Sequence, residues 1–420
     1  MTTQRTTSAA RKRVAVLVSL TALVLGAAGA AVATGATSAD PGVTATTIKL
    51  GGTFPLTGPA ALYGTIPVAA NAYFNYVNDH GGVNGRKIKF VFYDDAYDPS
   101  QTVAMTQKLV GSDRIFADYL SLGTAMNLAI RPYLNRQKIP QVLISTGDSY
   151  WAAQYRQFPW TIGYQPDYPG EAKIYAKFIN AKVPQAKIGV LYQNDAYGQN
   201  YLNALKQGLG AKGAKKIVDA EGYDVNAPDV VQQLLKLKAS GANVFVDFAT
   251  PSSSIKALAT ATHVGWHPAA IFVNNISAST NFMVLAAKAG ADVNRVITAT
   301  WIKNAPDPAM AKDAGVKLYK SILARYYAKA DVSDQNVYNA ISNAWTMVYA
   351  LKHAGNPPTR AGLMHALTHL NVVNPFLVKG IVLRTTPTER FPVDQLTLAR
   401  WQGGVEGGWN YFGHLYSNAR

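Results

Sequence analysis

The stretch IKLGGTF at Ile48–Phe54 opens the segment of the chain that decides the fold. A helical pattern follows over Tyr63–Asp79 and stops at Gly81-Gly82, and a second apolar run, IKFVFY, occupies Ile88–Tyr93. Short runs of β-branched and aromatic residues favour strands, and glycine commonly ends helices. A strand, a helix and a second strand in this order predict a parallel βαβ unit.

The same alternation continues on both sides of one interruption. Before it, the expected helices and strands are Pro99–Val110, Ile115–Leu120, Ala125–Arg136 and Val142–Ile144. After it, they are Glu171–Asn180, Ile188–Tyr192, Gln199–Leu209, Lys216–Ala220, Asp229–Ala239, Val244–Phe248, Ser252–His263, Ala270–Asn274 and Val296–Thr300. Each series predicts a parallel sheet covered by helices on both faces, so the expected fold class is α/β with two doubly wound lobes.

The interruption at residues 147–170 is rich in aromatic residues and proline, which predicts a crossover between the lobes. Later in the chain, helices are expected over Ala309–Ala328, Gln335–Ala354 and Thr359–Leu370. Short apolar runs follow at Leu377–Leu383 and Leu396–Trp401. Helices and short strands after two sheets predict that the chain returns to complete both lobes.

The first 39 residues have the composition of a secretory signal peptide. A basic start ending in Arg11-Lys12-Arg13 precedes the apolar run Val14–Leu25, and small residues follow. This order predicts cleavage after Ala33 or Ala39. The alternative is an uncleaved membrane anchor, because the apolar run through Ala33 reaches about 20 residues.

The composition excludes several classes of protein. Hydrophobic residues make up 48% and charged residues 15%, which is typical of a globular chain rather than a disordered one. Cysteine is absent, so we expect neither a disulfide nor a lipid attached to an N-terminal cysteine. Removal of the four basic residues of the first 39 lowers the formal charge from +16 to +12. The remaining Lys and Arg residues are dispersed, so we expect no nucleic-acid partner.

Motifs for catalysis, cofactors and metals are missing from the sequence. It contains no G-x-S-x-G, H-E-x-x-H, P-loop or EF-hand pattern. His263 and His267 are four residues apart, as are His365 and His369, but neither pair has an acidic third ligand nearby. We therefore expect no enzyme activity, no cofactor and no metal.

A series of short motifs carries a family resemblance. In chain order the motifs are Pro55–Pro59, Tyr63-Gly64, Asn78–Arg86, Asp94–Pro99, Leu122–Thr124, Ser145–Gly147, Phe158–Thr161 and Tyr192–Gly198. With this order and spacing, the chain from about Thr47 to Tyr411 resembles the leucine/isoleucine/valine-type substrate-binding proteins of ABC importers. These proteins have the type I periplasmic binding fold.

The resemblance implies two lobes joined by a three-segment hinge, with the ligand in the cleft between them. Residues 46–163 and about 300–373 would form lobe 1, and residues 164–299 and about 374–415 would form lobe 2. The first crossing would fall near Trp160–Tyr164 and include the hinge residues Trp160 and Thr161, with Trp160 in the core of the hinge rather than in contact with the ligand. The other crossings would fall near Thr298–Trp301 and Val373–Leu377.

The resemblance also implies which residues touch the ligand. Gly123, Thr124 and the loop with Ser145, Thr146 and Asp148 would meet a ligand carboxylate. The other expected contacts are Tyr63, Tyr197, Thr250 and Asn275. The alternatives are that Thr124 and Tyr197 only cap helices and that Tyr63 only packs.

Two residues depart from the pattern of the family. Asn275 stands where an acidic residue would pair with the α-ammonium of an amino acid, and an amide is the weaker partner. Asp148 places a carboxylate in the loop that receives the ligand carboxylate, where two like charges repel. Either Asp148 points to solvent, or the ligand is not an amino acid in the usual pose.

The resemblance implies a function in capture rather than catalysis. The expected ligand is a branched-chain amino acid or a related small compound with a polar head and an apolar or aromatic body. The expected partners are the membrane permease subunits of an ABC importer, and the protein would be a monomer in the periplasm or secreted. The alternatives are a ligand-sensing subunit for a membrane receptor and an extracytoplasmic enzyme on the same scaffold.

Overall fold

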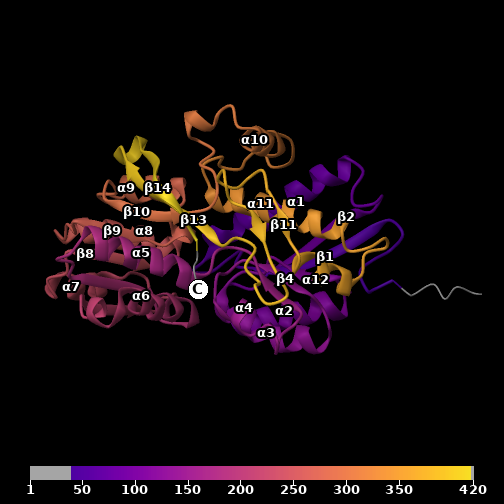
Figure 1. Ribbon diagram of the computed structural model, residues 1–420, viewed down its shortest axis with the longest axis horizontal. Coiled ribbons are helices and arrows are strands. Elements are labelled where there is room, and N and C mark those ends of the chain that lie inside the picture. Colours follow the sequence, from indigo (N-terminus) through magenta and orange to yellow (C-terminus); the bar gives the residue numbers. More distant parts are fainter. Residues whose placement is uncertain (1–38, 418–420) are drawn as a thin grey trace, which may run out of the picture. The chain divides into compact units, whose positions relative to one another are not determined.

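The computed structural model describes residues 39–417, which belong to one compact unit. The signal-peptide prediction falls almost entirely on residues 1–38, outside the described residues. Within the described part, no helix has both the length and the apolar character needed to cross a membrane. Figure 1 shows the helices and strands in two groups, each around its own sheet.

The first sheet confirms the βαβ unit predicted at the start of the chain. Its five strands are parallel and have the order β2-β1-β3-β4-β5. The strands are β1 (Thr47–Phe54), β2 (Lys87–Asp94), β3 (Ala117–Tyr119), β4 (Gln141–Ile144) and β5 (Thr161–Gly163). The helices between them are α1 (Thr65–Asp79), α2 (Pro99–Gly111), α3 (Thr124–Arg136) and α4 (Tyr150–Ala153), with the short 3-10 helix η1 (Ala61–Gly64) before α1.

Local sequence explains where these helices begin. In α2, the carboxylate of Asp98 accepts hydrogen bonds from the N–H groups of Ser100 and Gln101 at 2.8 and 2.9 Å. Pro99 occupies the first helical position, where its missing N–H costs nothing. The helix therefore starts at the residue that the sequence predicts.

The second sheet has seven strands in the order β14-β13-β10-β9-β8-β6-β7. Five are parallel: β6 (Ile188–Gln193), β7 (Ile217–Tyr223), β8 (Val244–Phe248), β9 (Ala270–Val273) and β10 (Val296–Thr300). The connecting helices are α5 (Tyr168–Lys182), α6 (Ala196–Ala214), α7 (Val231–Ala239), α8 (Pro251–His263), the 3-10 helix η2 (Asn275–Ser277) and α9 (Thr280–Lys288). Strands β8 and β10 are buried along their whole length, as is usual for central parallel strands.

The C-terminal edge of the second sheet is antiparallel, whereas the sequence predicted a parallel sheet. Strands β13 (Gln395–Gln402) and β14 (Gly408–Ser417) form a hairpin around η4 (Gly404–Glu406), and β13 pairs with β10. A hairpin needs only a short connection, whereas a parallel strand would need a crossover helix. The chain therefore finishes the sheet with an antiparallel pair.

The segment between β10 and β13 packs on the first lobe. Its elements are η3 (Pro308–Met310), α10 (Ala314–Tyr326), α11 (Gln335–Lys352), α12 (Arg360–Leu367) and the antiparallel pair β11 (Asn371–Val372) and β12 (Leu383–Arg384). Helices α10 and α11 both pack against α1. The first of the three helices begins later than the sequence predicted, because the side chain of Asp313 caps α10 by accepting the N–H of Val316.

The last crossing lies later in the chain than Val373–Leu377. Phe376 packs edge-on against Tyr73 of α1, at 6.3 Å between ring centroids. Further on, the guanidinium of Arg390 donates to the carbonyl of Thr161 at 3.0 Å. Residues 374–394, which the sequence assigned to lobe 2, thus keep contacts with lobe 1, and the chain crosses just before β13.

Candidate ligand-binding site

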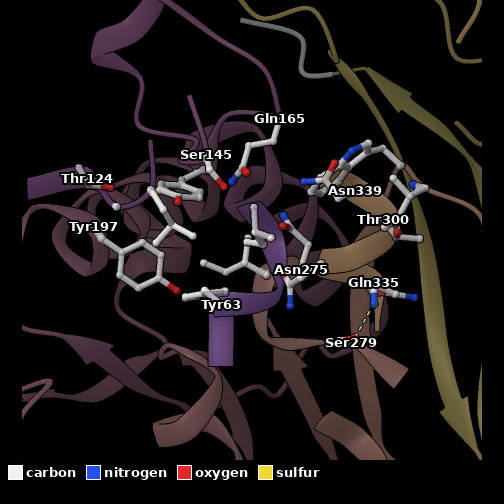
Figure 2. A pocket seen from close by; sticks show the side chains of 18 of the residues that line it. Tyr63, Thr124, Ser145, Gln165, Tyr197, Asn275, Ser279, Thr300, Gln335 and Asn339 are labelled. Carbon is white, nitrogen blue, oxygen red and sulfur yellow. Dashed lines mark hydrogen bonds between the residues drawn. The ribbon is translucent and has the colours of Figure 1, made fainter. Parts of the chain in front are cut away.

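A pocket lies where the carboxyl ends of both sheets face each other. The space between its atoms is about 610 Å³, including its opening to solvent. Segments that follow β1 to β5 line it from the first lobe. The start of α5 and segments that follow β6, β9 and β10 line it from the second, and the start of α11 completes it. Ligands of open α/β sheets bind beyond the carboxyl ends of the strands, so this is the candidate site (Figure 2).

The structure brings six of the nine predicted contact residues to the wall of this pocket. They are Tyr63, Gly123, Thr124, Ser145, Tyr197 and Asn275. The other three, Thr146, Asp148 and Thr250, are buried but do not line it. The predicted hinge residues Trp160 and Thr161 lie at the start of β5, just before the first crossing.

Gly123 shapes the turn between β3 and α3. Its φ of +96° is in the left-handed region, and an added Cβ would lie 2.1 Å from Cε of Met126 and 2.9 Å from the ring of Tyr97. Only glycine fits here without a shift of its neighbours. Gly123 is also the N-cap of α3 and makes no side-chain cap, which leaves the first N–H groups of the helix without that partner.

Thr124 and Thr146 form a hydroxyl pair beside this turn. Their Oγ1 atoms are 2.6 Å apart, and Thr146 also lies 3.0 Å from the hydroxyl of Tyr168. The N-cap of α3 is Gly123, so Thr124 does not cap the helix, which was the alternative to a ligand contact. Thr146 does not line the pocket, but its hydroxyl holds the hydroxyl of Thr124 through this hydrogen bond.

Tyr197 lies in an aromatic cluster on the second-lobe side. Its ring meets the ring of Tyr168 edge-on at 5.2 Å between centroids, and its hydroxyl donates to the carbonyl of Ala249 at 3.3 Å. The cap of α6 is Asp195, whose carboxylate accepts the N–H of Tyr197 at 3.0 Å. The side chain of Tyr197 is thus part of the pocket wall rather than a helix cap.

Asp148 does not line the pocket, and it does not point to solvent, which was the first of the two alternatives. Only 1% of Asp148 is exposed, and one carboxylate oxygen accepts the N–H of Tyr150 at 2.8 Å. Burial raises its pKa to about 6, while the charge of the nearby Arg131 acts in the opposite direction. Thr250 is also held away from the wall, by hydrogen bonds of its hydroxyl with Tyr223 and Gln193.

A buried carboxylate holds Asn275 in place. Glu171 at the start of α5 accepts the backbone N–H of Asn275 at 2.8 Å and the side-chain amide of the same residue. It also accepts the hydroxyls of Tyr175 and Tyr201 at 2.5 and 2.7 Å. Burial raises the pKa of Glu171 to about 7, although these hydrogen bonds act to lower it. The amide nitrogen of Asn275 faces Glu171, so its Oδ1 is the atom left for the pocket.

Six buried polar atoms of the wall have no hydrogen-bond partner. Three are donors, Nε2 of Gln165, Nδ2 of Asn336 and Nε1 of Trp301; two are acceptors, Oδ1 of Asn275 and Oδ1 of Asn339; and the hydroxyl of Tyr63 can act as either. A buried polar group without a partner is unfavourable, so these atoms are suited to bind a ligand. Among the described residues, none of the side chains that line this pocket is charged. The described residues also contain no cluster of three or more side chains able to hold a metal.

Sequence reasoning missed several residues of the wall. Gln165 and Tyr168 lie in the aromatic crossover, whose composition was a usable signal, and Tyr97 follows the Asp94-Asp95 motif. Gln335 and Asn339 come from the start of α11, far along the chain from the strand ends, and nothing local in the sequence marks them.

Comparison with known proteins places this architecture in a family. The family model described as "Periplasmic binding protein" matches residues 47–406. The leucine-, isoleucine-, valine-, threonine- and alanine-binding protein of Pseudomonas aeruginosa is 30% identical over 202 residues, which cover 47% of this chain and 52% of the relative. The Leu/Ile/Val-binding protein of Escherichia coli is 27% identical over 196 residues, covering 46% and 51%. The chain spans about half the length of the curated relatives it matches.

Solved structures share the fold over most of the chain. A substrate-binding periplasmic protein from Ralstonia solanacearum has a TM-score of 0.77 at 24% identity, covering 87% of this chain and 100% of its own. A branched chain amino acid ABC transporter protein from Thermus thermophilus with bound valine has a TM-score of 0.77 at 18% identity, covering 89% and 97%. A fatty acid ABC transporter substrate-binding protein from Thermomonospora curvata has a TM-score of 0.73 at 23% identity, covering 89% and 94%.

The family model spans both sheets apart from β14, together with the crossings between them, and the solved structures match the same two-lobed arrangement. The resemblance in the sequence motifs is thereby confirmed. The chain belongs to the periplasmic binding protein family and has its type I fold.

Proposed function

We propose that this protein is the extracytoplasmic solute-binding component of an ABC importer, and that it captures one small molecule by closing its two lobes. The observation that carries the proposal is that the wall of this pocket comes from both lobes. A ligand that touches both lobes favours the closed form over the open one.

Hydrogen bonds between the lobes occur beside the pocket. The hydroxyl of Ser279, before α9, accepts the N–H of Gln335 of α11 at 2.7 Å (Figure 2). A second hydrogen bond between the lobes joins α6 to the start of α4: the amide of Asn200 donates to the hydroxyl of Ser149 at 3.2 Å. These bonds support closure as the state in which a ligand is held.

The proposed contacts of the ligand are the six predicted residues that line the pocket. Aliphatic side chains such as Ile66, Leu122 and Ile276 would pack against an apolar body, and the start of α3 would meet a polar head. The relatives are named for leucine, isoleucine and valine, and one solved structure is named for fatty acids. The proposed ligand is therefore a small compound with a polar head and an apolar or aromatic body.

The proposed setting is the periplasm or the cell exterior, reached through the predicted signal peptide. The proposed partners are permease subunits that recognise the closed form of a monomer. The protein itself would carry out no chemical step, because its pocket supplies contacts rather than an acid, base or nucleophile with a matched partner.

The test combines ligand identification with transport. Small molecules released from the purified protein by denaturation are identified by mass spectrometry, and each is titrated back by calorimetry. Small-angle X-ray scattering with and without the compound then measures whether the radius of gyration decreases on binding. Uptake of the labelled compound by cells that lack or carry the gene completes the test.

The proposal predicts binding, compaction and gene-dependent uptake of the same compound. Binding and compaction without any effect on uptake would favour a sensing subunit. Turnover of the bound compound into a product would contradict the proposal and favour an enzyme.

A further inference from the structure

The charges around the pocket limit the kind of ligand that it can hold. An amino acid carries an ammonium and a carboxylate on the same carbon, and both enter the closed site. The wall residues of the described chain contain no Asp, Glu, Lys, Arg or His. Burying an ammonium without a carboxylate beside it is unfavourable, because its hydration is lost and no opposite charge replaces it.

Three carboxylates that accept hydrogen bonds from wall residues are already engaged by the protein. Glu171 accepts four hydrogen bonds, including both from Asn275. Asp334 caps α11 and accepts the hydroxyl of Thr65 at 3.1 Å. Asp195 accepts the amide of Gln193 at 2.6 Å and caps α6. None of these three carboxylates lines the pocket, so none is placed to pair with a ligand ammonium.

Asp148 does not supply the missing charge either. Its second oxygen has no hydrogen-bond partner, but the residue does not line the pocket and interacts electrostatically with Arg131.

One end of the pocket is suited to a negative charge. The start of α3 presents N–H groups there, and its first turn contains no acidic residue. Helix N-termini favour anions because of their exposed N–H groups and the helix dipole. Gln165 is a second, independent donor: it is 3% exposed, it lines the same pocket, and its Nε2 has no partner.

From this asymmetry, and resting on the solute-binding function proposed above, we propose that the ligand is a small carboxylic acid that lacks an amino group next to the carboxylate. The start of α3 and Gln165 bind the carboxylate. Asn275 and Asn339 offer uncharged acceptors, and Asn336 an uncharged donor, to a neutral polar group such as a hydroxyl on the rest of the molecule. The aliphatic and aromatic side chains of the wall pack on its apolar body.

The test compares matched compounds that differ in one charged group. One series is 4-methylpentanoate, leucine and 4-methylpentanamide, and the other, which adds a neutral hydroxyl at the far end, is 3-(4-hydroxyphenyl)propanoate, tyrosine and 3-(4-hydroxyphenyl)propanamide. Each is titrated by calorimetry into protein from which bound molecules have been removed by unfolding and refolding. We expect the acid of at least one series to bind at least about tenfold more tightly than both its amino acid and its amide.

The possible outcomes separate this inference from the proposed function. An amino acid that binds as tightly as the matched acid overturns the inference but leaves solute binding intact. An amide that binds as tightly as the acid overturns the role of the carboxylate. Failure of both series to bind overturns the inference, and failure of every compound released from the purified protein to bind again overturns the proposed function as well.

A pair of variants tests the charge argument within the wall. Asn339→Asp adds a carboxylate of nearly the same size, and Asn339→Leu removes the acceptor without adding charge. We expect Asn339→Asp to weaken binding of the acid at least about tenfold and to reduce its preference over the amino acid, and Asn339→Leu to change that preference much less. Melting temperatures confirm that both variants fold. Equal preference in Asn339→Asp and the unmodified protein would overturn the proposal.

Discussion

Glu171 and Asn275 are joined by two hydrogen bonds, one from the backbone N–H of Asn275 at 2.8 Å and one from its side-chain amide. This arrangement decides which atom Asn275 presents to the pocket. An ionised carboxylate accepts but does not donate, so the amide nitrogen turns toward Glu171 and the oxygen turns away from it. A residue outside the wall thereby controls the chemistry of a residue in it.

The buried Glu171 gives a prediction for stability against pH. Burial raises its pKa to about 7 in the folded protein, above the value of about 4.3 in an unfolded chain. Its contribution to stability is then complete below about pH 4 and is lost as the pH rises through about 7. We expect the free energy of unfolding, measured by urea titration, to fall over this window by on the order of 1–3 kcal/mol.

Two variants distinguish the contribution of Glu171 to this dependence of stability on pH from the contributions of other buried acids. Glu171→Gln should flatten the profile and also weaken ligand binding, because the glutamine amide no longer fixes Asn275. Asp118→Asn is the control, since burial raises the pKa of Asp118 to about 7 and the residue does not line the pocket. It should flatten the profile without weakening binding. A profile unchanged in both variants would contradict the assignment.

Gln165→Met should have opposite effects on stability and binding. The unpartnered Nε2 of Gln165 is unfavourable in the empty protein, so its removal should leave the melting temperature unchanged or raise it. Loss of a donor to the ligand should weaken binding by about tenfold, measured by calorimetry. The control is Gln141→Met, because Gln141 is equally buried but bonded to Asn127 and Thr161. It should lower stability and leave affinity unchanged.

Gly123→Ala should impair both folding and binding. Its positive φ strains any residue other than glycine, and an added Cβ would lie 2.1 Å from Cε of Met126 and 2.9 Å from the ring of Tyr97, so these two side chains must shift. We expect a loss of about 2 kcal/mol or more in urea titrations, together with loss of ligand binding. Gly81→Ala is matched in φ at +93° but meets no atom within 4 Å. It should show only the cost of the left-handed backbone, and equal behaviour of the two variants would refute the steric argument.

Asp148→Asn should leave ligand affinity within about threefold of the unmodified protein, because the residue does not line the pocket. The measurement is a calorimetric titration at neutral pH, with Thr124→Val as the comparison that should weaken binding. A large loss of affinity in Asp148→Asn would show that the loop rearranges to bring the carboxylate to the ligand.

Parts of the site that follow directly from one strand could be predicted from the sequence. Ser145 directly follows β4, and Gly123 and Asn275 come within four residues of the ends of β3 and β9; parallel strands bring such residues to one edge of a sheet. The rule needs no knowledge of distant parts of the chain. The same local logic predicted the start of α2 from Asp98 and Pro99.

The remainder depends on contacts between distant segments. Asn339 reaches the pocket because α11 packs on α1, more than 250 residues earlier in the chain. Asp148 is buried in the neighbourhood of Arg131 of α3, a neighbour that its own loop does not reveal. The last crossing is displaced because Phe376 and Arg390 pack on the first lobe, and the apolar pattern of 374–394 suits either lobe.

Trp301 gives the protein an optical signal of its own. All seven tryptophans lie in the described part of the chain, and Trp301 is the one among them that lines the pocket. Its indole N–H is without a partner there, so a ligand changes the polarity and the hydrogen bonding of this ring directly. The emission wavelength of intrinsic fluorescence should therefore report occupancy without any label, and Trp301→Phe should abolish the change while the other six tryptophans still emit.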